Sequence, residues 1–283
     1  MSTEEAVGVA DLCVSAPFSG GRRAIVDEVS FTIGRGEVAA LIGESGSGKT
    51  TIALALMGHA RGGCRISAAK LRVGDIDVLG LSRRALFEFR GRKVCYIAQS
   101  AAAAFNPARR IMAQVIEGAL IHGLMKREAA EAKAVGLFRA LQLPEPERIG
   151  ARFPHQVSGG QLQRLLAAMA LITDPELLIL DEPTTALDVT TQIEVLALLR
   201  DLIREFGTAG LYITHDLAVV AQIAHRIMVL RHGKMVEVGD AKQVLEAPRT
   251  AYATALVNER RAATHTPLID PPAAAEPLLS VTN

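Results

Sequence analysis

The residues best suited to chemistry form one glycine-rich segment, Gly43-Glu44-Ser45-Gly46-Ser47-Gly48-Lys49-Thr50. It fits the pattern of a phosphate-binding loop that ends in a lysine and a hydroxyl residue. Glycines let successive backbone N–H groups turn inward around phosphates, and the following helix adds the partial positive charge of its N-terminus. We expect Lys49 on the β- and γ-phosphates, Thr50 on Mg²⁺ and Thr51 next to them in the site. The segment therefore predicts a nucleoside triphosphate site.

Two adjacent carboxylates follow the apolar run Leu177–Leu180, which predicts a buried strand. Asp181, at the end of that strand, can hold Mg²⁺ through water. Glu182 can orient and deprotonate a water molecule that attacks the γ-phosphate. The alternative is a solvated acidic turn before Pro183, and the phosphate loop upstream makes that the weaker interpretation.

A third motif, Ser158-Gly159-Gly160-Gln161, precedes the apolar helical run Leu162–Ile172. The serine and the glutamine three residues later form a capping box. A cap does not need the two glycines, which lower helix propensity, so they indicate that the backbone approaches another group closely. Because a helix N-terminus attracts anions, a nucleotide phosphate is the expected group.

The elements that must position these motifs alternate between strands and helices from residue 38 onward. Five short apolar runs predict a parallel sheet covered on both faces: Val38–Ile42, Val94–Ile97, Leu177–Leu180, Leu211–Ile213 and Ile227–Leu230. Two earlier runs, Val7–Val14 and Ile25–Ile33, predict antiparallel strands, and the block from Ile111 to Ile172 predicts an inserted helical subdomain. Beyond Asp240 we expect two short helices and then a mobile, proline-containing tail.

Composition excludes several classes of protein. The chain has 283 residues with 31 Lys plus Arg and 30 Asp plus Glu, so its formal charge of +1 gives no bias toward nucleic acid or anionic lipid. No apolar stretch reaches the roughly 18 residues that span a bilayer. The acidic start, Met1–Glu5, lacks a secretory signal, which predicts a cytoplasmic location. Cys13, Cys64 and Cys95 fit neither a disulfide framework nor a zinc site.

Together these motifs resemble the ATPase subunits of ATP-binding cassette (ABC) transporters. That family shows, in order, a phosphate loop, a Gln loop, a Leu-Ser-Gly-Gly-Gln signature, a strand ending in Asp-Glu, a Leu-Asp loop and a switch His. This chain supplies them in the same order over about residues 7 to 258: Gly43 to Thr50, Gln99, Val157-Ser158-Gly159-Gly160-Gln161, Asp181-Glu182, Ala186-Leu187-Asp188 and His215. Val157 replaces the commoner leucine, a mild apolar change.

The resemblance implies an α/β fold of the P-loop NTPase class, with a RecA-like parallel sheet core and an antiparallel β subdomain. Residues 1–239 would form the nucleotide-binding domain, with the helical subdomain inserted at about 100–172. Residues 240–263 would form a short C-terminal extension and 264–283 a disordered tail.

The resemblance also implies the roles of single residues. Two such subunits would pair head to tail, so that each ATP lies between one phosphate loop and the partner's signature segment, Ser158 to Gln161. Three residues are the expected catalytic set: Glu182 would polarise the attacking water, His215 would contact the γ-phosphate, and Gln99 would link Mg²⁺ and water to the helical subdomain. Thr50, Gln99 and Asp181 would then hold the metal. Asp188 would join the nucleotide site, and it could also cap the helix Val189 to Phe206.

One expected feature is displaced. The family stacks adenine on an aromatic side chain some two dozen residues before the phosphate loop, and the matching position here is Ala16. Phe18, two residues further on, could serve through a shifted loop, and we take it as the adenine contact.

Several details resemble the branch that imports peptides, nickel and related chelates. They include Phe105-Asn106-Pro107, Phe153-Pro154-His155-Gln156 and a degraded C-terminal stretch, Pro248-Arg249-Thr250-Ala251-Tyr252-Ala253. No cysteine follows Cys95, so no iron–sulfur cluster is expected. The branch implies a second, unlike ATPase subunit, with a homodimer as the alternative. It also implies two permease subunits, a periplasmic binding protein and a position on the cytoplasmic face of the inner membrane.

Two other functions are weaker interpretations. A soluble cassette ATPase of ribosomes or DNA would carry two cassettes or a coiled-coil insertion together with basic patches. A P-loop kinase would leave the segment Ser158 to Gln161 unexplained.

Overall fold

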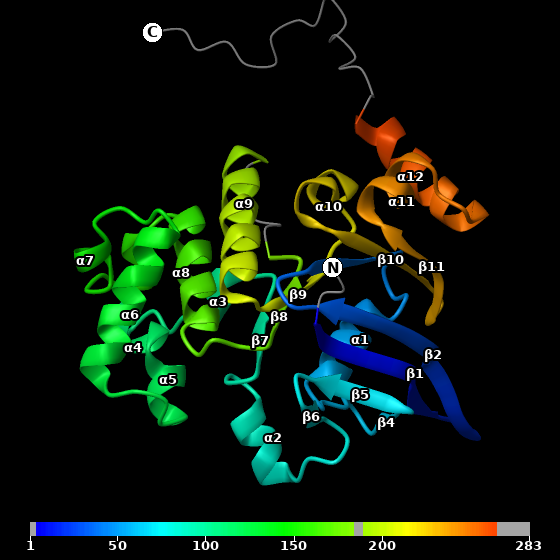
Figure 1. The fold of residues 1–283 in the computed structure, drawn as a ribbon, viewed down its shortest axis with the longest axis horizontal. Helices are drawn as coiled ribbons and strands as arrows, with labels where there is room; N and C mark the ends of the chain where they lie inside the picture. Colours follow the sequence, from blue (N-terminus) through cyan, green and yellow to red (C-terminus); the bar gives the residue numbers. More distant parts are fainter. Residues whose placement is uncertain (1–3, 184–188, 265–283) are drawn as a thin grey trace, which may run out of the picture.

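The computed structural model describes residues 4–183 and 189–264, which form two sheets with helices around them (Figure 1). The strands in these residues are β1 (Glu5–Phe18), β2 (Gly21–Gly34), β3 (Val38–Ile42), β4 (Arg65–Ser67), β5 (Lys70–Val73), β6 (Ile76–Asp77), β7 (Val94–Ile97), β8 (Leu177–Asp181), β9 (Ala209–Ile213), β10 (Arg226–Arg231) and β11 (Lys234–Asp240).

The helices of the same residues are α1 (Lys49–Leu56), α2 (Arg83–Phe89), α3 (Ala101–Ala104), α4 (Ile111–Val115), α5 (Glu117–Ile121), α6 (Arg127–Ala140), α7 (Pro146–Ile149), α8 (Gly159–Leu171), α9 (Val189–Phe206), α10 (Leu217–Ile223), α11 (Ala241–Glu246) and α12 (Ala251–Thr264), with one 3₁₀ turn at Pro154–Gln156.

The first sheet carries the motifs and has the strand order β11-β10-β3-β9-β8-β7. The pairs from β10 to β7 are parallel, whereas β11 adds to β10 as an antiparallel edge strand. Strands β3 and β9 are buried throughout, as expected for continuous apolar runs in a sheet covered on both faces. Because β3, β7, β8 and β9 run in one direction, their carboxyl ends meet at one edge of the sheet, and the predicted chemical residues follow these ends.

The second sheet is antiparallel and has the order β2-β1-β5-β6, with β4 paired to β1 (Figure 1, blue and cyan). Its apolar residues share one core with helix α1 and one face of the parallel sheet. Helix α1 is therefore held between the two sheets, with Ile52 and Leu56 fully buried. This packing fixes the helix that follows the glycine-rich loop.

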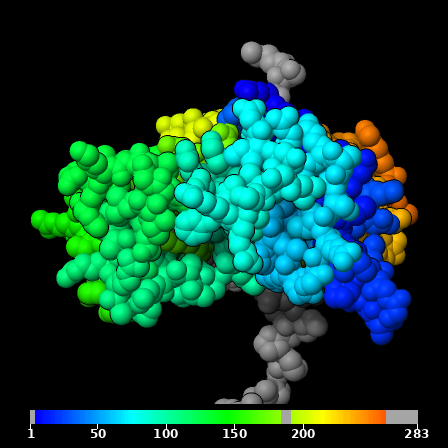
Figure 2. Space-filling view, turned by 90° about the horizontal axis from the view of Figure 1, so that it is seen from below, coloured from blue at the N-terminus to red at the C-terminus, as the bar shows by residue number. Residues whose placement is uncertain are grey.

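Helices α3 to α8 form a separate group beside the sheets, drawn in green in Figure 1. Their core includes Phe138 and Leu165 and continues into α9 and the strands β7 and β8. Helices α10, α11 and α12 pack on the face of the parallel sheet that contains Ile42 and Val229. Figure 2, seen from below, shows the green helical group adjoining the cyan surface that contains α2.

The structure confirms the predicted α/β class, the parallel core and the antiparallel pair β1–β2. The sequence pattern missed β4, β5, β6 and α2, because these elements are short and mostly half-exposed, so that no apolar run marks them. It also missed β11, an edge strand in which Glu237 is the one buried residue, so that no apolar run marks it. The final helix is longer than expected, since it continues to Thr264.

No helix within 4–183 or 189–264 has the length and apolar character that crossing a bilayer requires. Cys13, Cys64 and Cys95 are free thiols in the structure. Burial raises the pKa of Cys95 to about 11, so this thiol stays protonated inside the helical core.

Candidate functional site

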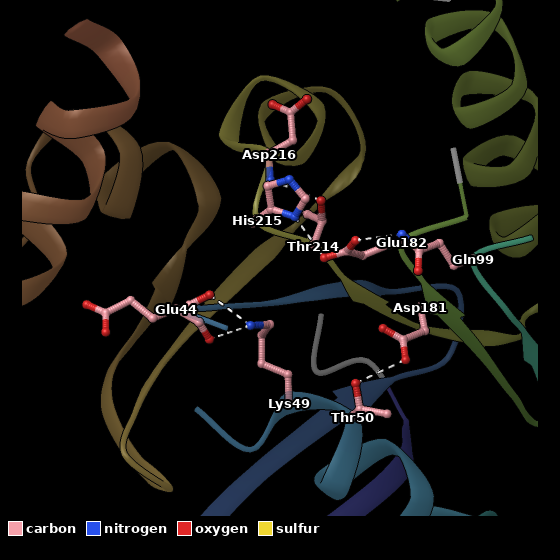
Figure 3. Close-up of polar contacts among 10 residues, drawn as sticks. Glu44, Lys49, Thr50, Gln99, Asp181, Glu182, Thr214, His215 and Asp216 are labelled. Carbon is pink, nitrogen blue, oxygen red and sulfur yellow. Dashed lines mark hydrogen bonds and ion pairs between the residues drawn. The ribbon is translucent and has the colours of Figure 1, made fainter. Parts of the chain in front are cut away.

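A cavity of about 850 Å³ lies at the carboxyl ends of the parallel strands. Among the residues that line it are most of the glycine-rich loop, Thr50, Thr51, Gln99, Asp181, Glu182 and His215. Open parallel sheets bind ligands at this edge. Figure 3 shows that the polar side chains of three separate strand ends point toward one another there.

The glycine-rich loop connects β3 to α1 through backbone conformations that favour glycine. Gly43 and Gly48 have φ angles of 151° and 108°. A β-carbon on Gly43 would lie 2.2 Å from the carbonyl oxygen of Leu230, so the loop packs against β10 with no room for a side chain. Gly48 forms the N-cap of α1 and provides no side-chain hydrogen bond, which leaves the first backbone N–H groups of the helix without a side-chain cap.

Lys49 crosses the mouth of this loop and is only 9% exposed. Its Nζ donates hydrogen bonds to the carbonyl oxygens of Gly43 and Glu44, both at 2.8 Å (Figure 3). Burial lowers the pKa of Lys49, and the nearby carboxylates of Glu182, Asp181 and Glu44 oppose that shift. The cation is thus held at the cavity by its own loop.

The carboxylate of Asp181 accepts two hydrogen bonds on a single oxygen. The hydroxyl of Thr50 donates to Asp181 Oδ2 at 3.1 Å, and the hydroxyl of Tyr96 donates to the same atom at 2.6 Å. Burial and the bond to Asp181 raise the pKa of Tyr96, so its hydroxyl stays protonated. Tyr96 also lines the cavity and lies outside every motif that the sequence analysis considered.

The three predicted catalytic residues meet beyond the ends of β7, β8 and β9. His215 Nδ1 lies 2.7 Å from Glu182 Oε1, and Gln99 Nε2 donates to Glu182 Oε2 at 3.4 Å (Figure 3). Glu182 has a φ of 48°, and its backbone N–H donates to the carbonyl oxygen of Ile213 at 2.9 Å. This left-handed turn directs the chain away from the strand at the residue where the chemistry is expected.

The residues present fit a magnesium nucleotide on three structural grounds. Within the part of the chain that the structure describes, Ser47 Oγ is buried without a hydrogen-bond partner, and the start of α1 has no side-chain cap. Both features suit the binding of phosphate oxygens. Thr50 and Asp181 supply the oxygen atoms that Mg²⁺ prefers, few enough to leave positions for water and phosphate.

The signature segment lies elsewhere, and none of its described residues lines the cavity. Ser158 caps α8 by accepting from the Gln161 N–H at 3.3 Å, and Gln161 Oε1 accepts from the Ser158 N–H at 3.1 Å. A β-carbon on Gly160 would lie 2.6 Å from Thr191 Cγ2 in α9. Packing inside this chain therefore accounts for one of the two glycines, a reason that the sequence analysis did not consider. Asp188 lies outside the described residues.

The predicted adenine contact does not reach the cavity. Phe18 ends β1 at the tip of the hairpin, is 64% exposed and is absent from the cavity wall. Ile25 of β2 lines the cavity instead, on the same antiparallel sheet, and Arg61 does so from the loop after α1. The hairpin carries Phe18 past the site because β1 and β2 both run for 14 residues.

The C-terminal helix also contributes to the cavity wall, which the sequence did not indicate. Leu256 and Glu259 of α12 line it, and the Glu44 N–H donates to the Tyr252 hydroxyl at 3.4 Å. Glu237 in β11 anchors the start of this helix by accepting from the N–H groups of Arg249 and Thr250. The contact between Glu44 and Tyr252 joins residues 208 positions apart, so no local pattern reports it.

Comparison with known proteins agrees with this geometry. Residues 26–185 match the model of the family described as ABC transporter. The chain is 40% identical over 251 residues to the oligopeptide transport ATP-binding protein OppD of Salmonella typhimurium, covering 88% of this chain and 74% of that protein. It is 37% identical over 256 residues to the probable D,D-dipeptide transport ATP-binding protein DdpD of Escherichia coli, covering 90% and 78%.

A longer relative and a solved structure extend the comparison. The chain is 36% identical over 306 residues to the glutathione import ATP-binding protein GsiA of Pectobacterium atrosepticum, covering 98% of this chain but 49%, about half, of that protein. The dimeric structure of MJ0796, a bacterial ABC transporter cassette, superposes with a TM-score of 0.70 at 25% identity, covering 83% of this chain and 98% of that one. These matches confirm the resemblance inferred from the motifs. The chain therefore belongs to the ABC transporter family of ATP-binding proteins.

Proposed function

We propose that this chain is the ATP-hydrolysing subunit of an ABC importer that takes up peptides, nickel or other metal chelates across the inner membrane. The observation that carries the proposal is the meeting of Gln99, Glu182 and His215 beside Lys49 and Asp181 in one cavity. Relatives whose names state dipeptide, oligopeptide or glutathione transport support the import of peptides. A ribosome- or DNA-associated role finds no support among these relatives.

Each residue of the cavity would have its own role in binding or hydrolysis. Lys49, the loop N–H groups and Ser47 would hold the phosphates, while Thr50 and Asp181, with Gln99, would hold Mg²⁺. When bound, Mg²⁺ neutralises charge on the phosphate oxygens. The Glu182 carboxylate takes the proton of the attacking water, because His215 and Gln99 hold its two oxygens in a fixed orientation.

The site of one chain is half of the proposed site. The segment Ser158 to Gln161 is outside the cavity, and Ser158 and Gly159 are exposed. We propose that a second ATPase subunit, an unlike chain with a similar signature, brings its own segment over this cavity and receives ours in return. Asp188 would join that interface. The dimer reported for MJ0796 supports pairing of such cassettes.

An exposed apolar groove favours a membrane partner. Phe87 in α2 is 66% exposed and Ile121 in α5 is 61% exposed, and both line a hollow of about 400 Å³. Arg83 and Arg90 add positive charge to its edge. An amphipathic helix with an acidic residue fits such a groove, so we propose that a cytoplasmic helix of one of two permease subunits docks there. A periplasmic binding protein would deliver the cargo to these permeases.

The test is reconstitution of the chain with a second ATPase and two permeases in lipid vesicles that contain ATP. We expect ATP-dependent uptake of a peptide or nickel chelate when the binding protein is added. Phe87→Asp should abolish uptake and leave nucleotide binding by the free chain intact. Absence of uptake for every peptide and chelate, or purification with ribosomes and not with membranes, would exclude the proposal.

A further inference from the structure

Two side chains of the described residues donate hydrogen bonds to Asp181, and of these Tyr96 lies outside the nucleotide motifs. It lies in β7, and its ring reaches the end of the neighbouring strand β8. In the parallel register Tyr96 lies opposite Ile179, and Asp181 follows two residues later on the same face. The pairing of two buried strands therefore fixes the approach of the hydroxyl to the carboxylate, with an O–O distance of 2.6 Å.

Asp181 Oδ2 accepts two hydrogen bonds, and Asp181 and Thr50 can still bind a metal ion together. A hydroxyl oxygen keeps lone pairs while its proton is donated, so Thr50 can bond Asp181 and still offer an oxygen lone pair to a cation. Tyr96 adds a second donor to the same oxygen, and bonds from a hydroxyl to a carboxylate are among the stronger ones. With Oδ2 held twice, the carboxylate plane cannot rotate freely.

We propose that Tyr96 is a positioning residue for the divalent cation. Its hydroxyl holds the Asp181 carboxylate in the one orientation in which Asp181 and Thr50 can hold Mg²⁺ together. The inference rests on the proposed function, because it assumes that the cavity takes a magnesium nucleotide. It goes further by assigning metal affinity to a residue outside the nucleotide motifs.

The experiment compares Tyr96→Phe with the unaltered chain by binding of a fluorescent ADP analogue, titrated with Mg²⁺ and repeated in EDTA. Loss of a residue that orients a metal ligand lowers metal affinity roughly 10-fold or more. We therefore expect the half-saturating Mg²⁺ concentration to rise by about that factor, with unchanged nucleotide affinity in EDTA. If Tyr96 had a structural role alone, Tyr96→Phe would lower nucleotide affinity equally with Mg²⁺ and in EDTA.

Tyr252→Phe is the matched control. It also removes a phenol oxygen, but the Tyr252 hydroxyl bonds the Glu44 N–H of the glycine-rich loop and not Asp181. We expect its Mg²⁺ dependence to equal that of the unaltered chain. Equal Mg²⁺ dependence in Tyr96→Phe, or equal losses with and without Mg²⁺, would overturn the role of Tyr96 and leave the proposed function standing. If the unaltered chain binds no nucleotide under either condition, both proposals are wrong.

Discussion

Helices α1 and α8 both carry glycine at their start, but their first turns are built in opposite ways. Among the described residues, the start of α1 has no side-chain cap and the buried Ser47 hydroxyl just before it has no hydrogen-bond partner, while the helix begins with the buried Lys49. The start of α8 has both hydrogen bonds of a capping box, and Ser158 and Gly159 are exposed. One helix start is left open for an anion, whereas the other is already satisfied by its own side chains.

This difference bears on how each half of the proposed nucleotide site would depend on other molecules. The loop before α1 is held by packing inside the chain, since Gly43 lies against Leu230 and Lys49 bonds the loop carbonyls. Its conformation is therefore supported by contacts inside the chain. The start of α8 lies on the surface of the helical group and would meet a nucleotide only through a second chain. The following predictions test that division.

The largest expected effect is on turnover in Glu182→Gln. If the Glu182 carboxylate takes the proton from water, the amide should lower the hydrolysis rate by about 10²- to 10⁴-fold, the typical contribution of a general base. Binding of ATP should persist, since Lys49 and the loop are unchanged. The variant should then accumulate as a dimer with α8 of one subunit over α1 of the other, which light scattering with the second ATPase and ATP would detect. Turnover close to normal would remove Glu182 from this role.

Lys49→Ala should weaken nucleotide binding at the glycine-rich loop before α1. The cation is almost fully buried among Glu182, Asp181 and Glu44, and truncation of one partner of a buried charge pair costs about 2–5 kcal/mol. We expect nucleotide affinity to fall by at least roughly 30-fold, the equivalent of the lower value. Isothermal titration of the isolated chain with ATP and Mg²⁺ measures this, and a change below threefold would contradict it.

Glycine at position 160 has two explanations, which are packing against Thr191 and close approach to a nucleotide. Gly160→Ala tests the first. The new methyl would press on Thr191 Cγ2, and overpacking of this kind costs about 1–3 kcal/mol of unfolding free energy. The double variant Gly160→Ala/Thr191→Ser removes the obstructing methyl and should recover most of the stability, measured by urea unfolding. Nucleotide binding by the isolated chain should be unchanged in both.

The same pair tests whether α8 approaches a nucleotide in the assembled dimer. If the backbone of Gly160 contacts phosphate there, hydrolysis by the dimer should stay low in the double variant although its stability returns. Recovery of hydrolysis along with stability would mean that packing against Thr191 is the whole reason for glycine.

The sequence predicted the parallel sheet and the chemical edge because both have local signals. Apolar runs mark β3, β7, β8 and β9, and the motifs follow the ends of these strands. Convergence of Gln99, Glu182 and His215 then follows from the parallel direction of β7, β8 and β9, which are adjacent in the sheet.

The contacts that the sequence did not predict join residues that are far apart in the chain and that no motif connects. Tyr96 and Asp181 are 85 positions apart, and Glu44 and Tyr252 are 208 apart. Their pairing depends on strand register and on how α12 packs, neither of which a single sequence reports. The ring of Phe18 lies off the cavity wall for a similar reason, because the length of the β1–β2 hairpin decides where that ring lies, and its role as the adenine contact stays a prediction.

The smallest expected effect belongs to Phe18. Its ring is 64% exposed and outside the cavity, so Phe18→Ala should leave ATP affinity within about twofold, the usual range for a surface substitution. Ile25→Ala is the contrasting variant, because Ile25 lines the cavity and its truncation removes apolar contact from whatever base is bound. Affinity for ATP should therefore fall in Ile25→Ala and not in Phe18→Ala. The reverse order would show that the hairpin closes over the base. Nucleotide binding at the loop before α1 would then depend on a rearrangement, as it would at the start of α8.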